Sequence, residues 1–197
     1  LADPQRSLGA PGPRATWSCQ GAPLPVAVDA GCPDGHLAEV TFAFAWDGGA
    51  CQRTVLLPVG PATVLFQDDF ESGASAWALA GTWGLTEESA GSPTHSLTDS
   101  PGAAYGNGVN AAAQLASPLD LTDVAEPVLS FQTRHALEEL YDYGYVEGSR
   151  DGLTWQRLAG LTGTRSGWQE RRVPLTAFAG ESAVRLRMRL RTDTYVT

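Results

Sequence analysis

The sequence contains neither lysine nor isoleucine, so all 13 of its basic residues are arginine. Its 22 acidic residues leave a net charge of −9 at pH 7. A nucleic-acid-binding protein needs a basic surface that neutralises phosphates, and this chain has no domain-wide basic field. Carboxylates are, however, the ligands that divalent cations prefer. We therefore expect no nucleic-acid partner, while a metal site remains compatible with the composition.

Long apolar runs and familiar catalytic motifs are also missing. No segment approaches the roughly 20 apolar residues of a membrane-spanning helix, so we predict no membrane span. His36, His95 and His135 are far apart and form no His-Glu-x-x-His zinc motif. There is no Gly-x-Ser-x-Gly elbow and no Gly-rich loop that leads into a helix. We expect a non-catalytic chain; a small hydrolase with dispersed catalytic residues is the weakest alternative.

Cysteine is scarce, and all three cysteines, Cys19, Cys32 and Cys51, lie within the first 51 residues. An odd number in a sequence of extracellular type indicates one disulfide and one unpaired thiol. Cys32 and Cys51 would lie near opposite ends of a hairpin strand, about 30 Å apart and far beyond the ~7 Å Cα limit of a disulfide. We predict a bridge from Cys19 to Cys51 or to Cys32, with three free thiols as the alternative.

The first 60 residues have the pattern of a linker followed by a hairpin. Residues 1–16 are rich in Pro, Gly, Ala and Arg and are predicted to be a linker. Apolar residues recur with period two in 37–46, which predicts a strand, and Asp47-Gly-Gly49 is a turn signal before a return strand in 51–59. A lone hairpin is marginal in water, so we interpret 17–60 as part of an Ig-like β-domain.

A second domain is expected over residues 63–197, after the boundary at Gly60-Pro-Ala62. Short strand candidates recur there between turn signals, with the spacing of a two-sheet sandwich or jelly roll. They cover 63–66, 77–80, 111–116, 128–135, 143–149, 155–160, 169–174 and 183–191. We predict an all-β chain, in which a jelly-roll-like β-sandwich follows a partial Ig-like β-hairpin.

The clearest strand alternates apolar residues with arginines along residues 184–191. One face is predicted to enter the core together with Leu129 and Phe131. That face comprises Val184, Leu186, Met188 and Leu190, and the other comprises Arg185, Arg187, Arg189 and Arg191. Like charges on one face repel one another unless acidic residues on neighbouring strands neutralise them, and Glu147 is the candidate partner. Two interpretations stay open: an ion-paired outer face, or a patch for an anionic ligand such as an acidic polysaccharide.

Aromatic and turn motifs follow one another through residues 66–197. They are Phe66-Gln-Asp-Asp-Phe-Glu-Ser-Gly73, Trp77, Gly81-Thr-Trp-Gly84, Leu97-Thr-Asp-Ser-Pro-Gly102 with Tyr105, Tyr141-Asp-Tyr-Gly-Tyr-Val-Glu147 and Ser149-Arg-Asp-Gly-Leu-Thr-Trp155. This order resembles a bacterial MAM-like jelly-roll module of secreted proteases of the immune inhibitor A and bacillopeptidase F type. Gly148 departs from the pattern, which usually has a branched apolar residue there.

The resemblance implies a non-catalytic accessory module that is secreted or held at the cell surface. Its partner would be its own catalytic domain or an extracellular matrix or glycan. The resembled modules have one more strand with acidic residues after the last segment here, so we interpret 63–197 as truncated at its C-terminal end.

The resemblance also implies structural Ca²⁺. In such modules an acidic residue of the opening Phe-Glu segment binds the ion with backbone carbonyls and an Asp near the final strand. This points to Asp69 and Glu71, with ordinary solvated carboxylates as the alternative. Asp99, Glu138 and Asp142 match acidic positions of the pattern and either share an ion or brace turns.

The alternating residues Tyr141, Tyr143 and Tyr145 lie on one face of a strand and form a candidate platform for sugar rings. The rival function is a carbohydrate-binding module of a secreted polysaccharide-degrading enzyme. Exposure of Tyr143, Tyr145 and the tryptophans distinguishes the two functions. The predicted ligand-binding residues are these three tyrosines with Arg185, Arg187 and Arg189.

Overall fold

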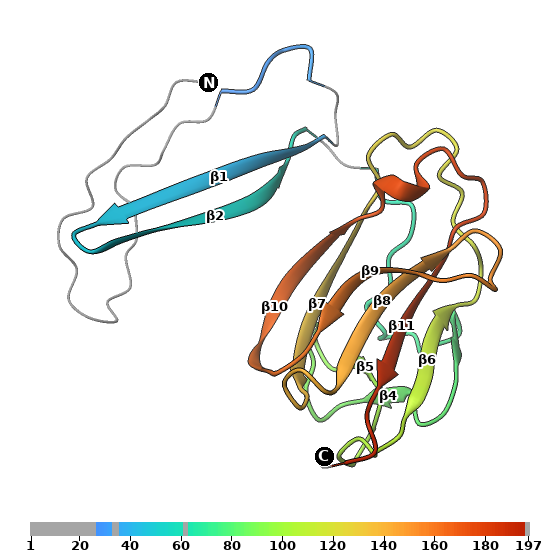
Figure 1. Ribbon diagram of the computed structural model, residues 1–197. Coiled ribbons are helices and arrows are strands. Elements are labelled where there is room, and N and C mark those ends of the chain that lie inside the picture. Colours follow the sequence, from blue (N-terminus) through green and yellow to red (C-terminus); the bar gives the residue numbers. More distant parts are fainter. Residues whose placement is uncertain (1–26, 33–35, 61–62, 196–197) are drawn as a thin grey trace. The chain divides into compact units, whose positions relative to one another are not determined.

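The computed structural model describes residues 27–32, 36–60 and 63–195 (Figure 1). The chain divides into two units, the first ending at Ala62 and the second beginning at Thr63. Strands dominate the described part, whose helical structure is one 3₁₀ turn, η1 (Thr176–Phe178). No helix in that part is long and apolar enough to cross a membrane. The predicted all-β class is confirmed.

The first unit contains an antiparallel hairpin of β1 (Leu37–Trp46) and β2 (Gly49–Pro58). Asp47 and Gly48 form the turn, and Gly48 has a φ of 96°, which glycine adopts without steric cost. The predicted strands and turn are confirmed. Cys32 and Cys51 are free thiols, and the predicted bridge through Cys19 involves a residue outside the described ranges.

The second unit is a β-sandwich whose larger sheet has the strand order β3-β6-β11-β8-β9, all antiparallel (Figure 1). These strands are β3 (Trp77–Leu79), β6 (Asn110–Leu115), β11 (Arg185–Arg191), β8 (Tyr143–Ser149) and β9 (Gln156–Leu161). The last strand in sequence, β11, therefore lies in the middle of this sheet.

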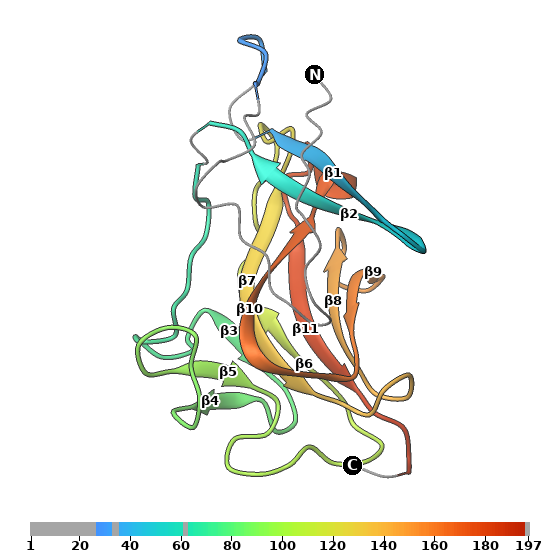
Figure 2. The same ribbon diagram turned by 90° about the vertical axis from the view of Figure 1, so that its left-hand side faces the viewer.

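Two smaller pairs form the opposing layer. They are β7 (Val128–Ala136) with β10 (Thr164–Pro174), and β4 (Gly84–Thr86) with β5 (Ser96–Thr98). In Figure 2 the β7–β10 pair lies in front of the five-stranded sheet. Trp168 of β10 links the two pairs, because its Nε1 donates to Ser89 Oγ between β4 and β5 at 3.0 Å. The jelly-roll-like sandwich predicted from the sequence is confirmed.

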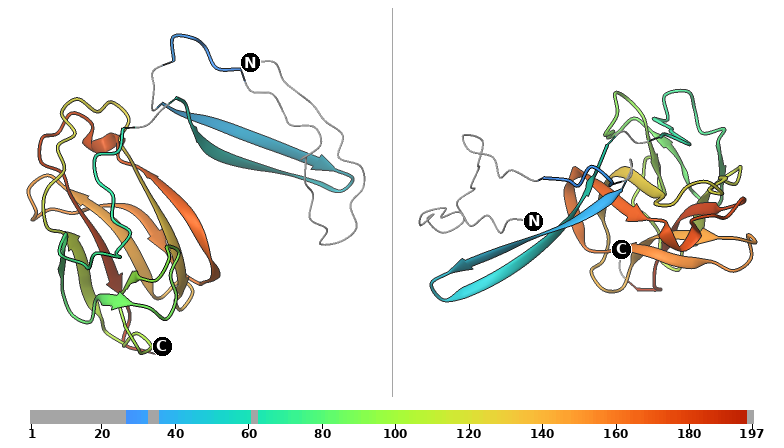
Figure 3. Two further views of the ribbon diagram at one scale, coloured as in Figure 1. Left: turned by 180° about the vertical axis from the view of Figure 1, so that it is seen from behind. Right: turned by 90° about the horizontal axis from the view of Figure 1, so that it is seen from above.

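The hydrophobic core includes Phe178 of η1, the short helical turn at one end of the sandwich (Figure 3). Its buried members are Leu121, Leu175, Phe178, Val184 and Leu186, with Leu119, Val124, Leu129 and Leu158 packed against them. Of the predicted core residues, Val184, Leu186 and Leu190 are buried, and Met188, Leu129 and Phe131 are half-buried.

Two features of the strand prediction are wrong. Residues 63–66 form no strand, and Val64 and Leu65 are exposed because no described strand pairs with this segment. The strands β4 and β5 were not predicted. Each has three residues, which is too short for alternation to be read from the sequence.

Gly148 departs from the resembled pattern for a packing reason. Its position in β8 faces the core, and a Cβ atom there would lie 2.5 Å from Phe178 Cε2 and 3.3 Å from Leu158 Cδ1. Real Cβ atoms do not approach another atom as closely as the 2.5 Å to Phe178. The ring of Phe178 thus occupies the space that a branched side chain would fill.

Candidate functional site

The outer face of the five-stranded sheet carries the alternating arginines of β11. Arg187 lies opposite Glu147 of β8 in the antiparallel register, so their side chains share this face. Glu147 Oε2 accepts hydrogen bonds from Arg187 Nε at 2.7 Å and from Arg189 Nε at 2.9 Å. Its Oε1 accepts one from Arg189 Nη2 at 2.5 Å. The predicted partner is therefore correct, and the ion-paired interpretation holds for these two arginines.

Burial and charge act in opposite directions on Glu147, which is 4% exposed. Burial is the largest influence and raises the pKa of Glu147, but the hydrogen bonds and charges of Arg189 and Arg187 together exceed it, so the pKa is lowered overall. Hydrogen bonding to Glu147 raises the pKa of Arg189. Glu147 and Arg189 are thus held in their charged forms.

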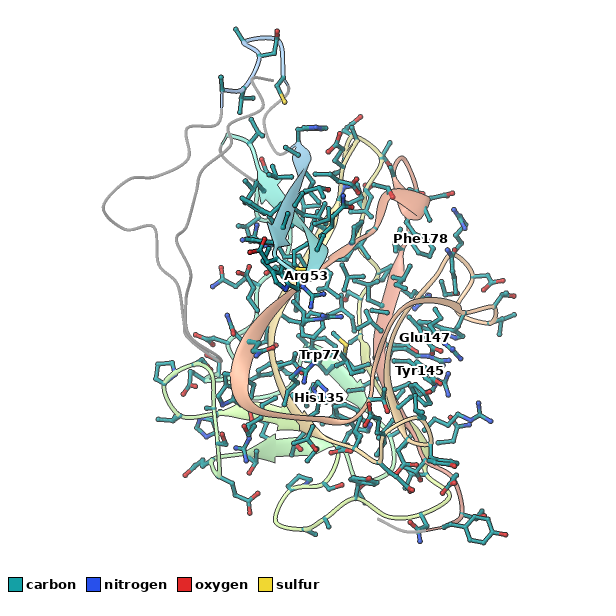
Figure 4. The ribbon with its side chains drawn as sticks, turned by 60° about the vertical axis from the view of Figure 1, so that its left-hand side comes forward. Arg53, Trp77, His135, Tyr145, Glu147 and Phe178 are labelled. Atoms are coloured by element: carbon teal, nitrogen blue, oxygen red, sulfur yellow. The ribbon has the colours of Figure 1, made fainter. Side chains whose placement is uncertain are left out.

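Tyr145 lies beside Glu147 on the same strand, as Figure 4 shows, and arginines cover it. Its ring stacks on Tyr143 with centroids 5.3 Å apart. The guanidinium carbons of Arg157 and Arg189 lie 3.9 Å and 5.0 Å from its ring centroid. Tyr145 is consequently 5% exposed, and its ring is not open to a sugar.

The other predicted aromatic groups differ in exposure. Tyr143 is half-buried, whereas Tyr141 precedes β8 and is 62% exposed. Trp155 is half-buried, and the guanidinium carbon of Arg187 lies 3.9 Å from its ring centroid. Of this group, Tyr141 alone offers an open ring within the described residues.

A depression of about 460 Å³ lies beside the arginines, over β3, β6 and β11. The strand register places Ala112 opposite Arg189 and Gln114 opposite Arg187, so all four share one face. The small alanine leaves space there, and Asn110 Oδ1 accepts a hydrogen bond from Arg189 Nη1 at 3.0 Å. Guanidinium, amide and methyl groups therefore line the depression, and these groups bind hydroxyls, carboxylates and apolar ring faces. Its described lining includes no histidine, carboxylate or hydroxyl side chain.

A second candidate site lies in loops at the end of the sandwich opposite η1. Glu138 and Asp142 belong to the connection between β7 and β8, and Asp193 follows β11. One carboxylate oxygen of each lies within 4.8 Å of those of the others. The structure thus brings together two predicted ligands, Glu138 and Asp142, and adds Asp193.

The other predicted metal ligands, Asp69, Glu71 and Asp99, are not members of this group. Asp69 Oδ1 accepts the backbone N–H of Glu71 at 3.1 Å. The Glu71 carboxylate accepts the backbone N–H groups of His95 at 2.8 Å and Thr94 at 3.1 Å, and it contacts His95 Nδ1 at 3.0 Å. Bonds led by that of the Thr94 hydroxyl lower the pKa of Glu71 to about 2. Asp99 is half-buried in the turn after β5, where burial raises its pKa.

Two site residues were not predicted from the sequence. Asp193 could have been found, because a carboxylate just after a central strand lies beside the loops at that edge of the sheet. Arg157 could not, because its position opposite Glu147 depends on a register shift between β8 and β9. The sequence carries no visible signal of such a bulge.

Comparison with known proteins gives one sequence relative and one structural neighbour of note. No family model matches the chain. The chain is 26% identical to bacillopeptidase F of Bacillus subtilis (strain 168) over 131 residues, which is 61% of this chain and 9% of that protein's length. A solved structure of carbohydrate-binding modules from the β-sandwich superfamily matches with a TM-score of 0.37 and 14% identity, covering 80% of this chain and 70% of that one. The similarity to bacillopeptidase F agrees with the type of protease that the resemblance names.

Proposed function

We propose that residues 63–197 form a non-catalytic, MAM-like accessory module of a secreted bacterial protease or surface protein. We further propose that it binds an extracellular glycan on the outer face of the five-stranded sheet. The similarity to bacillopeptidase F supports the accessory role. The observation that carries the binding role is the depression beside Arg187 and Arg189.

The charge of this face favours an acidic glycan. Glu147 forms ion pairs with two arginines, Arg187 and Arg189. Three more arginines lie at neighbouring positions of the same face: Arg185, Arg191 and Arg157. Guanidinium groups bind carboxylates in a fixed, often bidentate geometry. Because Glu147 already orients Arg187 and Arg189, little side-chain entropy would be lost on binding.

The rival candidate is a carbohydrate-binding module of a polysaccharide-degrading enzyme, which recognises sugars by stacking. The open ring of Tyr141, 62% exposed, favours it. The covered ring of Tyr145, 5% exposed, disfavours it. We therefore place hydrogen bonding by the arginine face ahead of stacking.

Native affinity electrophoresis tests the proposal. Polygalacturonate in the gel is expected to retard the chain more than neutral xylan does, and added salt is expected to weaken the retardation. The Ala112→Trp change fills the depression and is expected to abolish retardation. The matched control is Ala103→Trp, which places the same side chain on an exposed turn and is expected to leave retardation unchanged.

Retardation that survives Ala112→Trp but is lost in Tyr141→Ala would move the site to the rival candidate. Absence of retardation by any polysaccharide, together with binding to the catalytic domain of the parent protein, would replace the glycan by that domain as partner.

A further inference from the structure

We propose that Glu138, Asp142 and Asp193 form a binding site for a divalent cation, and that Ca²⁺ is the ion that fits it. The site is independent of the proposed glycan face. It differs from the pair Asp69 and Glu71, and it combines Glu138 and Asp142, which match acidic positions of the resembled pattern, with Asp193. The inference depends on two separate observations, the convergence of the carboxylates and the state of their buried oxygens.

The first observation is geometric. A ligand oxygen from each of the three residues lies within 4.8 Å of the others, a spread that one ion bridges when it binds oxygens at 2.3–2.6 Å. The residues come from two chain segments that are 51 positions apart at the contact between Asp193 N–H and Asp142 Oδ1, a hydrogen bond of 2.9 Å. In Figures 1 and 3 the segment after β11 lies at the end of the sandwich opposite η1.

The second observation is an unsatisfied buried carboxylate. Asp142 is 0% exposed. Its Oδ2 and the buried Glu138 Oε2 have no hydrogen-bond partner among the described residues. The Tyr105 hydroxyl faces Asp142, and burial and then the interaction with Asp142 raise the pKa of Tyr105. A buried carboxylate oxygen without a partner is costly, so native structures pair it with a donor or a metal.

No arginine compensates this charge in the described part of the chain. The ion pairs there join Glu71 and Glu87 to His95, and Glu147, Glu170 and Glu181 to arginines. None of them includes Glu138, Asp142 or Asp193. Three converging carboxylates repel one another, and a divalent cation between them removes both the repulsion and the unmet coordination.

The backbone around the site is fixed by contacts that need no ion. The hydroxyl of Tyr105 accepts the backbone N–H of Glu138 at 3.0 Å. Thr192 Oγ1 accepts the N–H of Val109 at 2.8 Å and donates to the carbonyl of Gly106 at 2.9 Å. The Gly108 N–H donates to the carbonyl of Asp193. These contacts hold the loops before β6, before β8 and after β11 together, so the ligands are preorganised.

The ligand chemistry selects the ion. Carboxylate oxygens are hard ligands, whereas zinc sites use histidine and cysteine, which this group lacks. Ca²⁺ takes six to eight oxygens in a flexible geometry and can complete its shell with water, while Mg²⁺ demands a compact octahedron. Extracellular calcium modules bind with Kd of about 10⁻⁴–10⁻³ M, and we expect an affinity in that range.

Thermal melting of the full chain in CaCl₂, MgCl₂ and EDTA tests the site. Calcium at about a hundred times Kd is expected to raise the melting temperature by roughly 5–10 °C over EDTA, with a smaller shift in magnesium. The changes Asp193→Asn and Asp142→Asn keep the shape and the oxygen that accepts the local N–H, and each is expected to abolish the calcium shift. Glu139→Gln, an exposed neighbour in the same loop, is the matched control and is expected to keep it.

The EDTA arm separates a metal ligand from a merely structural residue. Without calcium, Asp193→Asn relieves carboxylate repulsion and is expected to melt at or above the wild-type temperature. A wild type that melts equally in calcium and EDTA overturns the proposal. So does an Asp193→Asn chain that melts lower by the same amount in both. Loss of the calcium shift in Glu71→Gln with its retention in Asp193→Asn would assign the ion to the opening segment instead. Asp193 is half-buried, so its variant keeps the test decisive even if Asp142→Asn does not fold.

Discussion

Glu147 binds Arg189 through both of its carboxylate oxygens, with Oε2 accepting from Nε at 2.9 Å and Oε1 accepting from Nη2 at 2.5 Å. This bidentate contact lies on an outer sheet face, yet the Glu147 side chain is 5% exposed and that of Arg189 16%. The guanidinium groups cover the carboxylate that orients them. The charged groups of Glu147 and Arg189 are therefore held in place as an ordered part of the fold.

The Glu147→Gln change tests how much these ion pairs stabilise the fold. Gln keeps the shape but removes the charge, which leaves Arg187 and Arg189 partly buried without an anion. We expect a loss of about 2–3 kcal/mol in the free energy of unfolding, measured by urea denaturation. Because the pKa of Glu147 is lowered from 4.5, its contribution is present above that pH and is lost as pH falls through the folded-state pKa. The difference in the free energy of unfolding between wild type and variant should therefore become smaller at acidic pH.

Glu181→Gln is the control for that experiment. Its pair with Arg150 has side chains 42% and 51% exposed, and such surface pairs contribute less than about 1 kcal/mol. Equal losses in the two variants would show that the Glu147 cluster behaves as an ordinary surface pair.

Gly148 and Phe178 should be energetically coupled. A Cβ at Gly148 would lie 2.5 Å from the Phe178 ring, so Gly148→Ala is expected to cost about 1–3 kcal/mol through overpacking. In a Phe178→Leu background the same change should cost much less, because the smaller side chain leaves room. A double-mutant cycle measures the coupling, and additive effects would contradict the contact.

The pKa of His95 should lie above the ordinary value of 6.5, and the pKa of His135 should lie below it. The hydrogen bond with Glu71 raises the pKa of His95, and burial lowers the pKa of His135. Folding stability from His95 is therefore full below 6.5 and is lost as pH rises through its raised folded-state pKa. NMR of the imidazole protons should show both shifts. Glu71→Gln should lower the His95 value and leave that of His135 unchanged; a His95 pKa that does not move would contradict the pairing.

The strands that were predictable from sequence are those with a half-buried face. In β11 and the residue before it, apolar and charged residues alternate from Val184 to Arg191, and the alternation alone reveals which face is buried. The pair β4–β5 and the loop between its two strands were not predicted, because their arrangement depends on tertiary contacts such as the hydrogen bond from Trp168 to Ser89. Local pattern carries no information about such contacts.

The candidate sites also combine features that the sequence predicts with features that only the fold reveals. Glu147 was identified as the partner of the arginines because opposite charges on neighbouring strands must answer one another. The depression was not predicted, since it arises from small residues, Ala112 among them, that only the register places beside Arg189. Glu138 and Asp142 were chosen as ligands, but their convergence with Asp193 is a property of the folded loops.

Leu140 offers a stabilising change inside the loop of the proposed cation site. It has a φ of 70° and is 71% exposed, so its side chain strains the backbone without packing on the core. Leu140→Gly should raise the free energy of unfolding by about 0.5–1 kcal/mol, because glycine adopts this conformation without steric cost. The gain should be equal in calcium and in EDTA, since no ligand is altered.

Phe70 is the matched contrast, with a φ of 66°. Its ring is half-buried against that of Trp77, with centroids 6.0 Å apart. Phe70→Gly relieves the same backbone strain but removes this packing, so a net loss of roughly 2 kcal/mol is expected. Urea denaturation of both variants measures the difference. Destabilisation by Leu140→Gly would mean that its exposed side chain makes a contact that outweighs the strain at this position.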